Sequence, residues 1–195
     1  MNIDFTQWIH HRNRLELDLP QHVRAAVLVG LTREDFPRVL LTVRSQELKD
    51  HTGQIAFPGG KLEPNETVVQ AALRETLEEV GLPADHIQIM GLLDDTFTPA
   101  GRGFHVTPVL ASIPAEFAYC LSSEVAQTLL VPLTDLQKMV PERLERVSPW
   151  GSVHYIYRYL WQDPIHNPNQ NTIHDIWGMT ARVLFGILNP TLEEY

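Results

Sequence analysis

Residues 60–82 read GKLEPNETVVQAALRETLEEVGL, and this stretch decides both the fold and the chemistry that the chain can support. Each residue of an α-helix advances by about 100°, so Glu75, Glu78 and Glu79 fall on one face. Like charges at this spacing destabilise a helix, whereas Mg²⁺ and Mn²⁺ prefer oxygen ligands. The spacing therefore predicts a divalent-metal site with Glu75 and Glu79, and Glu78 as a third candidate, as its ligands. The alternative is a solvated acidic helix face, the usual meaning of a charge run.

The bounds of this helix can be read from its flanks. Thr67 with Gln70 three residues later is a capping-box pattern, so the helix is expected to begin near Thr67. Gly81, followed by Pro83, is expected to end it. The face opposite the glutamates has helical spacing of packing residues, namely Val69, Ala72, Leu73, Thr76 and Val80. One face is thus predicted to pack on the core while the other stays open for chemistry.

The same stretch resembles the Nudix box, G-x5-E-x7-R-E-U-x-E-E-x-G-U, in which U is a bulky aliphatic residue. The matching positions are Gly60, Glu66, Arg74, Glu75, Glu78, Glu79, Gly81 and Leu82. Thr76 stands where the pattern has an aliphatic residue. Its methyl group can pack on the core and its hydroxyl can bond the preceding helical turn, so this departure is expected to be tolerated.

A second motif lies directly upstream, where residues 40–60 read LLTVRSQELKDHTGQIAFPGG. This resembles the signature of the coenzyme A diphosphatase branch of the Nudix hydrolases, L-L-T-x-R-[SA]-x3-R-x3-G-x3-F-P-G-G. Lys49 replaces the second arginine of the signature, which keeps the charge but loses the planar two-point fork. The matching positions are Leu40, Leu41, Thr42, Arg44, Ser45, Gly53, Phe57, Pro58, Gly59 and Gly60, and residues 103–111, 124–136 and 176–184 look like the same branch.

This resemblance implies an α/β fold, the Nudix α/β/α sandwich, with a mixed β-sheet covered by helices. It also implies dependence on Mg²⁺ or Mn²⁺ and hydrolysis of coenzyme A and its derivatives to adenosine 3′,5′-bisphosphate and 4′-phosphopantetheine. The residues alone reach only metal-assisted attack of water on an anionic ester. A Nudix activity on ADP-ribose-type or dinucleotide diphosphates is the alternative. A non-catalytic nucleotide-binding module is less expected, because that role normally goes with a broken box.

Four further residues are candidates for catalytic roles: Glu66, Arg74, Glu78 and Glu124. Glu66 lies about 180° from Glu75 on any regular helix, so it is expected in the loop, either near the water shell of the metal or favouring the helix start. Glu78 either binds a second metal ion or pairs with Arg74 four residues earlier. Glu124 is a candidate distal base, a role that some Nudix enzymes use, or a plain surface glutamate.

Phosphate binding is expected from the basic residues beside the glycines. Arg44, Lys49 and Lys61, with Gly59 and Gly60, are the predicted substrate-binding residues in an otherwise acidic protein. A solvated lysine is the alternative for Lys61. His51 and His105 are expected at the surface or lining the substrate at most, because no spacing of histidine, cysteine and aspartate suggests zinc.

Length and composition limit the other possibilities. A chain of 195 residues fits one domain, residues 1–195 with a core of about 22–188. The net charge of −9, from 24 acidic and 15 basic residues, argues against a nucleic-acid partner and against an anionic membrane surface. A single cysteine, Cys120, cannot form an internal disulfide, and no secretion or membrane signal is recognised, so a cytoplasmic protein is expected. The expected partner is a small-molecule substrate.

Hydrophobic periodicity predicts the remaining elements. A short helix capped by Thr6 is followed by a hairpin and a structured loop, and a mixed sheet covered by helices is expected. The aromatic-rich segment 150–161 is expected in the core or at the interface of a homodimer. In chain order, the predicted elements are a helix over 6–15, strands over 23–31 and 39–43, a loop over 45–60, strands over 87–93, 107–113 and 126–132, a helix over 133–140, a strand over 153–161 and a helix over 173–188.

Overall fold

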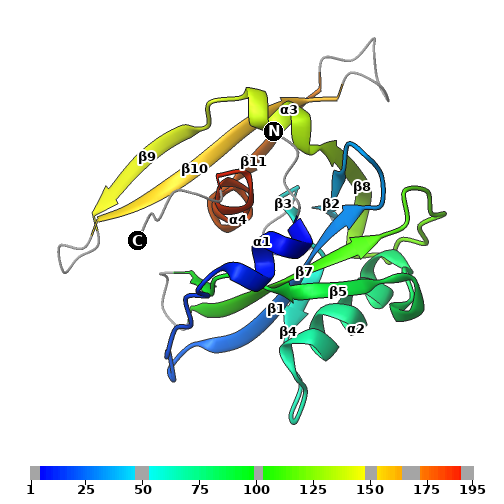
Figure 1. The fold of residues 1–195 in the computed structure, drawn as a ribbon, viewed down its shortest axis with the longest axis horizontal. Coiled ribbons are helices and arrows are strands. Elements are labelled where there is room, and N and C mark those ends of the chain that lie inside the picture. Colours follow the sequence, from blue (N-terminus) through cyan, green and yellow to red (C-terminus); the bar gives the residue numbers. More distant parts are fainter. Residues whose placement is uncertain (1–4, 47–52, 99–102, 148–152, 164–171, 190–195) are drawn as a thin grey trace.

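Two β-sheets organise the chain in the computed structural model, which describes residues 5–46, 53–98, 103–147, 153–163 and 172–189 (Figure 1). The helices are α1 Phe5–His11, α2 Val68–Val80, η1 Ala84–His86 (a 3₁₀ turn), α3 Leu133–Lys138 and α4 Gly178–Leu188. The strands are β1 Val23–Thr32, β2 Arg38–Arg44, β3 Ile55–Ala56, β4 Gly59–Lys61, β5 Gln88–Leu92, β6 Thr96–Phe97, β7 Phe104–Ile113, β8 Val125–Pro132, β9 Glu142–Val147, β10 Val153–Gln162 and β11 Ile173–Trp177.

The larger sheet has eight strands and is mixed, as predicted. Its main order is β3-β2-β1-β7-β5, and β8, β4 and β6 add to β2, β1 and β7. β1 and β7 run parallel over ten residues, from Val23 opposite Phe104 to Thr32 opposite Ile113. All other pairs in this sheet are antiparallel, including β1 with β2, which confirms the predicted hairpin.

Helix α2 covers one face of this sheet, and its ends lie where the sequence predicts them. The Thr67 side chain accepts a hydrogen bond from the backbone N–H of Gln70, the Gln70 side chain accepts one from the Thr67 N–H, and Gly81 ends the helix at φ 71°. Thr76 is fully buried, and its hydroxyl donates to the carbonyl of Ala72 at 2.7 Å. The apolar side of α2 packs on buried side chains of β1, β2 and β7.

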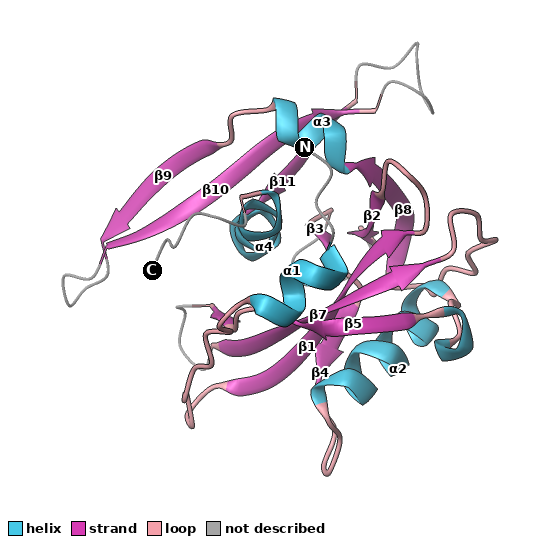
Figure 2. Ribbon diagram, viewed as in Figure 1, coloured by secondary structure: helices cyan, strands magenta, loops and turns pink. Residues whose placement is uncertain are grey.

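The opposite face of the large sheet is covered by α1, by α4 and by the second sheet, whose order is β11-β10-β9 (Figure 2). Helix α4 lies between the two sheets (Figure 1). One continuous core cluster joins Leu41 and Leu110 of the large sheet to Tyr159 and Trp161 of β10 and to Ile187 of α4. None of the described helices combines the length and the apolar composition that crossing a bilayer requires.

Three predicted elements have to be corrected. The first helix begins at Phe5, so Thr6 does not cap it, and it ends at His11 rather than Leu15. The predicted loop over 45–60 contains the short strands β3 and β4, which pair with β2 and β1. The predicted helix over 173–188 is a strand followed by a helix, because residues 173–177 pair with β10 and the chain turns at Gly178, where φ is 68°.

Candidate active site

The glycines before α2 set how closely the glutamate face approaches the sheet. β4 pairs with β1 through Gly59 and Gly60, and α2 packs beside it. A Cβ added at Gly60 would collide with the Glu75 carboxylate, and one at Gly59 would lie 2.6 Å from the Cα of Val27. Gly60 therefore allows the Glu75 carboxylate to lie directly against β4, and Gly59 allows β4 to lie close to β1.

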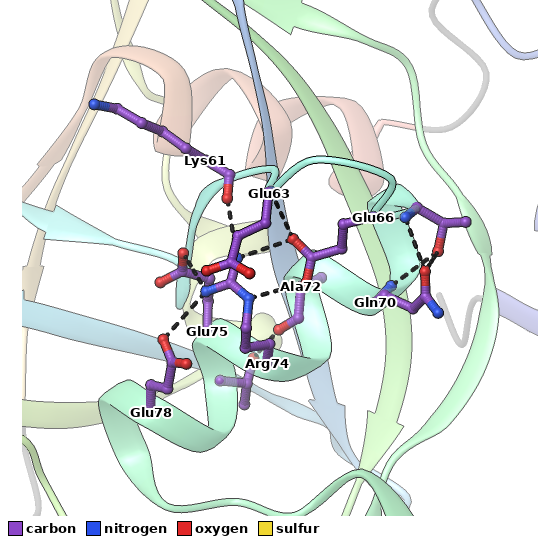
Figure 3. Close-up of polar contacts among 10 residues, drawn as sticks. Lys61, Glu63, Glu66, Gln70, Ala72, Arg74, Glu75 and Glu78 are labelled. Atoms are coloured by element: carbon purple, nitrogen blue, oxygen red, sulfur yellow. Dashed lines mark hydrogen bonds and ion pairs between the residues drawn. The ribbon is translucent and has the colours of Figure 1, made fainter.

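Arg74 is the centre of the polar contacts at this face (Figure 3). Its Nε and Nη2 donate to the two oxygens of Glu66 at 2.9 and 3.0 Å. Its Nη1 donates to Glu75 at 2.9 Å and to Glu78 at 3.1 Å, and its Nη2 also donates to the carbonyl of Lys61 at 3.0 Å. A guanidinium has five N–H donors, so this side chain is fully used in fixing its neighbours.

Glu66 lies in the loop before α2, as expected. Both of its oxygens bind Arg74, and one also accepts the backbone N–H of Glu63 at 2.9 Å. These hydrogen bonds, led by those from Arg74, lower the pKa of Glu66. The carboxylate therefore ties the loop to the helix.

Glu79 is the buried member of the glutamate stripe. Its side chain belongs to a residue only 7% exposed, and its Oε2 has no hydrogen-bond partner within the described residues. Burial raises the pKa of Glu79 to about 7, and the negative charge of Glu75 adds to this, while a hydrogen bond from the backbone N–H of Gly59 opposes it. A buried carboxylate oxygen without a partner is costly, and a bound cation would complete its coordination. The donor set at this position therefore fits Mg²⁺ or Mn²⁺.

The glutamates share one face of α2, but their carboxylates do not converge. In the part of the chain that the structure describes, no three acidic, histidine or cysteine side chains form a ready cluster for a metal ion. Glu75 and Glu78 instead turn toward Arg74, which contacts one oxygen of each. The stripe that the sequence predicts is thus divided between Glu75 and Glu78, which contact Arg74, and the buried Glu79.

Two residues from other elements approach Glu79. Arg44, at the end of β2, has its Nη2 4.0 Å from the Oε2 of Glu124, and its buried Nε has no hydrogen-bond partner within the described residues. Both charges act on Glu79, because Arg44 lowers its pKa and Glu124 raises it. Ser45 holds Glu124 in place by donating its backbone N–H to the Glu124 carbonyl at 2.8 Å. The structure therefore brings Arg44 and Glu124, 80 residues apart in the sequence, to the same site as Glu79.

The other residues expected at the site lie away from the glutamates of α2 or outside the residues that the structure describes. The Lys61 side chain extends away from Arg74 (Figure 3), with its Nζ 5.8 Å from the centre of the Phe104 ring. His105 bonds the buried Asp95 at 2.8 Å. Lys49 and His51 fall outside the residues that the structure describes.

Sequence reasoning missed the network around Asp95. This buried carboxylate accepts hydrogen bonds from Thr107 at 2.7 Å, from Arg14 at 2.6 Å and from the backbone N–H of Leu17 at 3.0 Å. These contacts anchor the segment after α1 to β7. The sequence signal that could have indicated this network is the adjacent pair of aspartates, Asp94 and Asp95, directly after a predicted strand.

Comparisons with known proteins agree with this arrangement. The family described as NUDIX domain matches residues 21–151. The chain is 33% identical over 182 residues to "Uncharacterized Nudix hydrolase NudL" of Photorhabdus laumondii, which covers 88% of this chain and 91% of that protein. The protein of the same name from Enterobacter sp. is 33% identical over 177 residues, covering 89% of this chain and 85% of that protein.

Two solved structures are similar to different extents of the chain. A C. elegans Ap4A hydrolase binary complex matches with a TM-score of 0.51 and 27% identity, over 60% of this chain and 84% of that one. A MutT/nudix family protein from Enterococcus faecalis matches with a TM-score of 0.53 and 19% identity, over 98% of this chain and 69% of that one. The second likeness shows the fold alone, and it extends through the second sheet and α4.

Proposed function

The chain belongs to the Nudix family, and from that membership we propose that it hydrolyses the diphosphate of coenzyme A and its derivatives. It is a Nudix hydrolase acting on a nucleoside diphosphate derivative, and the proposal concerns which one. The products would be adenosine 3′,5′-bisphosphate and 4′-phosphopantetheine or its acyl form. The signature residues 40–60 support this branch of the family.

One observation supports the proposal most strongly. The Nε of Arg44 and the Oε2 of Glu79 are both buried without a hydrogen-bond partner among the described residues, and the two charges are near enough to interact. The Nε of Arg44 needs a hydrogen-bond acceptor, and the Oε2 of Glu79 needs a cation or a hydrogen-bond donor. A diphosphate that binds together with a divalent cation supplies both at once, and Arg44 is also a position of the coenzyme A signature.

Glu75 and Glu79 would hold the metal ion, and Glu78 is the third candidate ligand. When bound, Mg²⁺ or Mn²⁺ supplies positive charge that offsets the diphosphate and acidifies water. Glu79 meets the requirement for a ligand because it is buried and its Oε2 has no hydrogen-bond partner among the residues that the structure describes. Glu75 meets it because Arg74 contacts only one of its oxygens.

Residues of the chain itself would bind and orient the substrate. Arg44 would bind the diphosphate oxygens through its fork, with Lys49 and Lys61 as further basic groups. The glycines Gly59 and Gly60 would let the substrate approach the backbone closely.

Arg74 and Glu66 would act by positioning Glu75, since their contacts are to each other and to the helix face. Glu124 is the candidate for the general base, because its carboxylate is 57% exposed and lies near both Arg44 and Glu79. A carboxylate at this position can accept a proton from the attacking water.

A second candidate function is hydrolysis of a dinucleotide or an ADP-ribose-type diphosphate. The likeness to an Ap4A hydrolase, at 27% identity over 60% of this chain, favours this alternative. Hydrolysis of either class of substrate would use the same carboxylates. The two activities would differ in the protein groups that recognise the parts of the substrate on either side of the diphosphate. A binding module without catalysis is disfavoured by the presence of every glutamate of the box.

The test is a product assay across coenzyme A, acyl-CoA, ADP-ribose, Ap4A and nucleoside triphosphates, with Mg²⁺ or Mn²⁺ and in water labelled with heavy oxygen. Coenzyme A should yield adenosine 3′,5′-bisphosphate, with the label on one of the two phosphate products and with the thiol and the 3′-phosphate intact. The variant Glu79→Gln is the matched control for contaminating hydrolases. A higher kcat/KM for Ap4A or ADP-ribose would establish the alternative, and release of dephospho-CoA or of a carboxylic acid would contradict both.

A further inference from the structure

Strand β9 is an open edge of the second sheet. It pairs only with β10, and the sheet order β11-β10-β9 leaves its other side without a strand partner in the described part of the chain. In Figure 1, β9 forms the outer border of that sheet. Residues 142–145 are all exposed, and Leu144 is 51% exposed. An exposed edge offers unpaired backbone N–H and C=O groups to another strand.

The charges of β9 are arranged symmetrically about Leu144. The strand reads ERLERV, so Glu142 and Arg143 precede Leu144 and Glu145 and Arg146 follow it. If two copies of β9 pair antiparallel with Leu144 opposite Leu144, position 142 lies opposite 146 and position 143 lies opposite 145. Arg143 of each copy then faces Glu145 of the other, and such cross-strand pairs of opposite charge are stabilising.

Neighbouring registers lack this match. Residues directly opposite each other in an antiparallel pair share one face of the sheet, so the two-fold axis passes through a residue position and the nearest alternative registers are centred on Arg143 or Glu145. A shift of one whole residue places Arg143 or Glu145 opposite its own copy. Each alternative therefore puts like charges directly opposite each other, which is destabilising.

We infer that β9 is a docking strand for a second copy of this chain, joined antiparallel about a two-fold axis at Leu144. Charged residues on an edge strand usually prevent pairing, but these charges match in one register and repel in the others. A two-fold contact uses the same patch on both copies, which suits a self-complementary strand. The pairing would extend the three-stranded sheet into a continuous sheet across the two subunits.

Contacts within one copy prepare the strand for this pairing. The Arg143 guanidinium lies 3.6 Å from the centre of the Tyr155 ring, on the neighbouring strand. Glu142 contacts Arg158 at 3.4 Å but its side chain stays 52% exposed, so it can also meet a partner. Leu144 lies opposite Ile156 of β10, and the self-contact of Leu144 would extend this apolar pair across the interface.

Charge reversal tests the register. The full-length protein is measured by sedimentation velocity across the micromolar range, and a dimer is expected. Glu145→Arg and Arg143→Glu each create two like-charge pairs in the dimer and should raise the dimer dissociation constant by at least about tenfold. The double variant R143E/E145R restores opposite charges and should restore the dimer. A monomer throughout, or a dimer that neither single variant weakens, would overturn the inference.

A cysteine at the two-fold axis gives an independent measurement. Leu144→Cys in a Cys120→Ser background should link two chains with a short thiol crosslinker. Val140→Cys in the same background is the control, because Val140 is 94% exposed but lies off the matched register. Equal linking of both variants, or none at Leu144→Cys, would count against the proposed axis, and retained catalytic activity shows that each variant is folded.

Discussion

Arg74 donates hydrogen bonds to both carboxylate oxygens of Glu66, which lies eight residues earlier in the sequence. Its Nε is 2.9 Å from Oε1 and its Nη2 is 3.0 Å from Oε2. The pair closes the loop between β4 and α2. The same guanidinium also bonds Glu75, so the position of a candidate metal ligand depends on a contact formed within the loop.

Replacing Arg74 by lysine should therefore disturb both the loop and the site. An ammonium is a point charge and cannot bind two carboxylate oxygens in a fixed plane. We expect Arg74→Lys to lower the free energy of unfolding by about 1–3 kcal/mol and kcat/KM by about tenfold or more. Thermal unfolding and steady-state kinetics measure both. Arg182→Lys, on the exposed side of α4, is the matched control, and equal effects of the two changes would disprove the role of Arg74.

Neutralising the candidate metal ligands should separate activity from stability. Glu75→Gln and Glu79→Gln should each reduce kcat by orders of magnitude. Without metal, the melting temperature of Glu79→Gln should rise, because burial and the charge of Glu75 both disfavour its ionised form. That of Glu75→Gln should stay equal or rise. The exposed Glu116→Gln is the control, and near-normal turnover in either variant would remove that residue from the site.

The stability of the metal-free protein should depend on pH through Glu79. Its pKa is about 7 in the folded chain against an ordinary value of 4.5, so the folded state binds this proton more tightly. The stabilising contribution is complete below pH 4.5 and is lost as the pH rises through about 7. The loss is about 3 kcal/mol at most. Urea unfolding in EDTA should show this decline in the wild type, and an equal decline in Glu79→Gln would assign it elsewhere.

Arg44 and Lys49 should contribute differently to substrate binding. Arg44→Ala should reduce kcat/KM for coenzyme A by an amount equivalent to about 2–4 kcal/mol, the scale of a lost charge-assisted phosphate contact. Lys49→Arg should keep or modestly improve that ratio, because a guanidinium binds two oxygens. ADP-ribose is the comparison substrate: an equal loss with both substrates assigns Arg44 to the shared diphosphate. No loss with either would contradict a phosphate contact.

Glu124 can be tested as the base. Glu124→Gln should reduce kcat by about 10²–10⁴-fold if it accepts the proton of the attacking water. Glu116→Gln again serves as the control, and an unchanged kcat in Glu124→Gln would leave Glu124 as a surface residue.

The extent to which sequence predicted this structure depended on how local each signal was. The ends of α2 follow from Thr67, Gln70 and Gly81, whose effects act within one turn, and these were predicted correctly. The helix predicted over 173–188 was wrong in its first part because the helical spacing of Ile176, Met179 and Val183 begins inside a strand. Residues 173–177 form a strand because they pair with β10. Gly178, which has a positive φ, lies at the junction between this strand and α4.

Parts of the candidate site depended on contacts that no spacing contains. The sequence placed Glu75, Glu78 and Glu79 on one face and gave a pair with Arg74 as one of two roles for Glu78, but it did not reveal that Arg74 would also contact Glu75. That outcome depends on the path of the loop, where Asn65 has a φ of 68°, and on the position of Glu66. Strand β9 was missed because its charged residues show no apolar alternation.

The position of α4 between the two sheets has a consequence for synthesis of the chain. Leu184 and Ile187 are almost completely buried in the core that Leu41 and Leu110 share, yet they lie well beyond residue 151, where the family match ends. A nascent chain on the ribosome would thus leave part of one apolar face of its large sheet uncovered until α4 is translated. Such exposed surface favours aggregation, so the chain is most prone to aggregate during synthesis before α4 emerges.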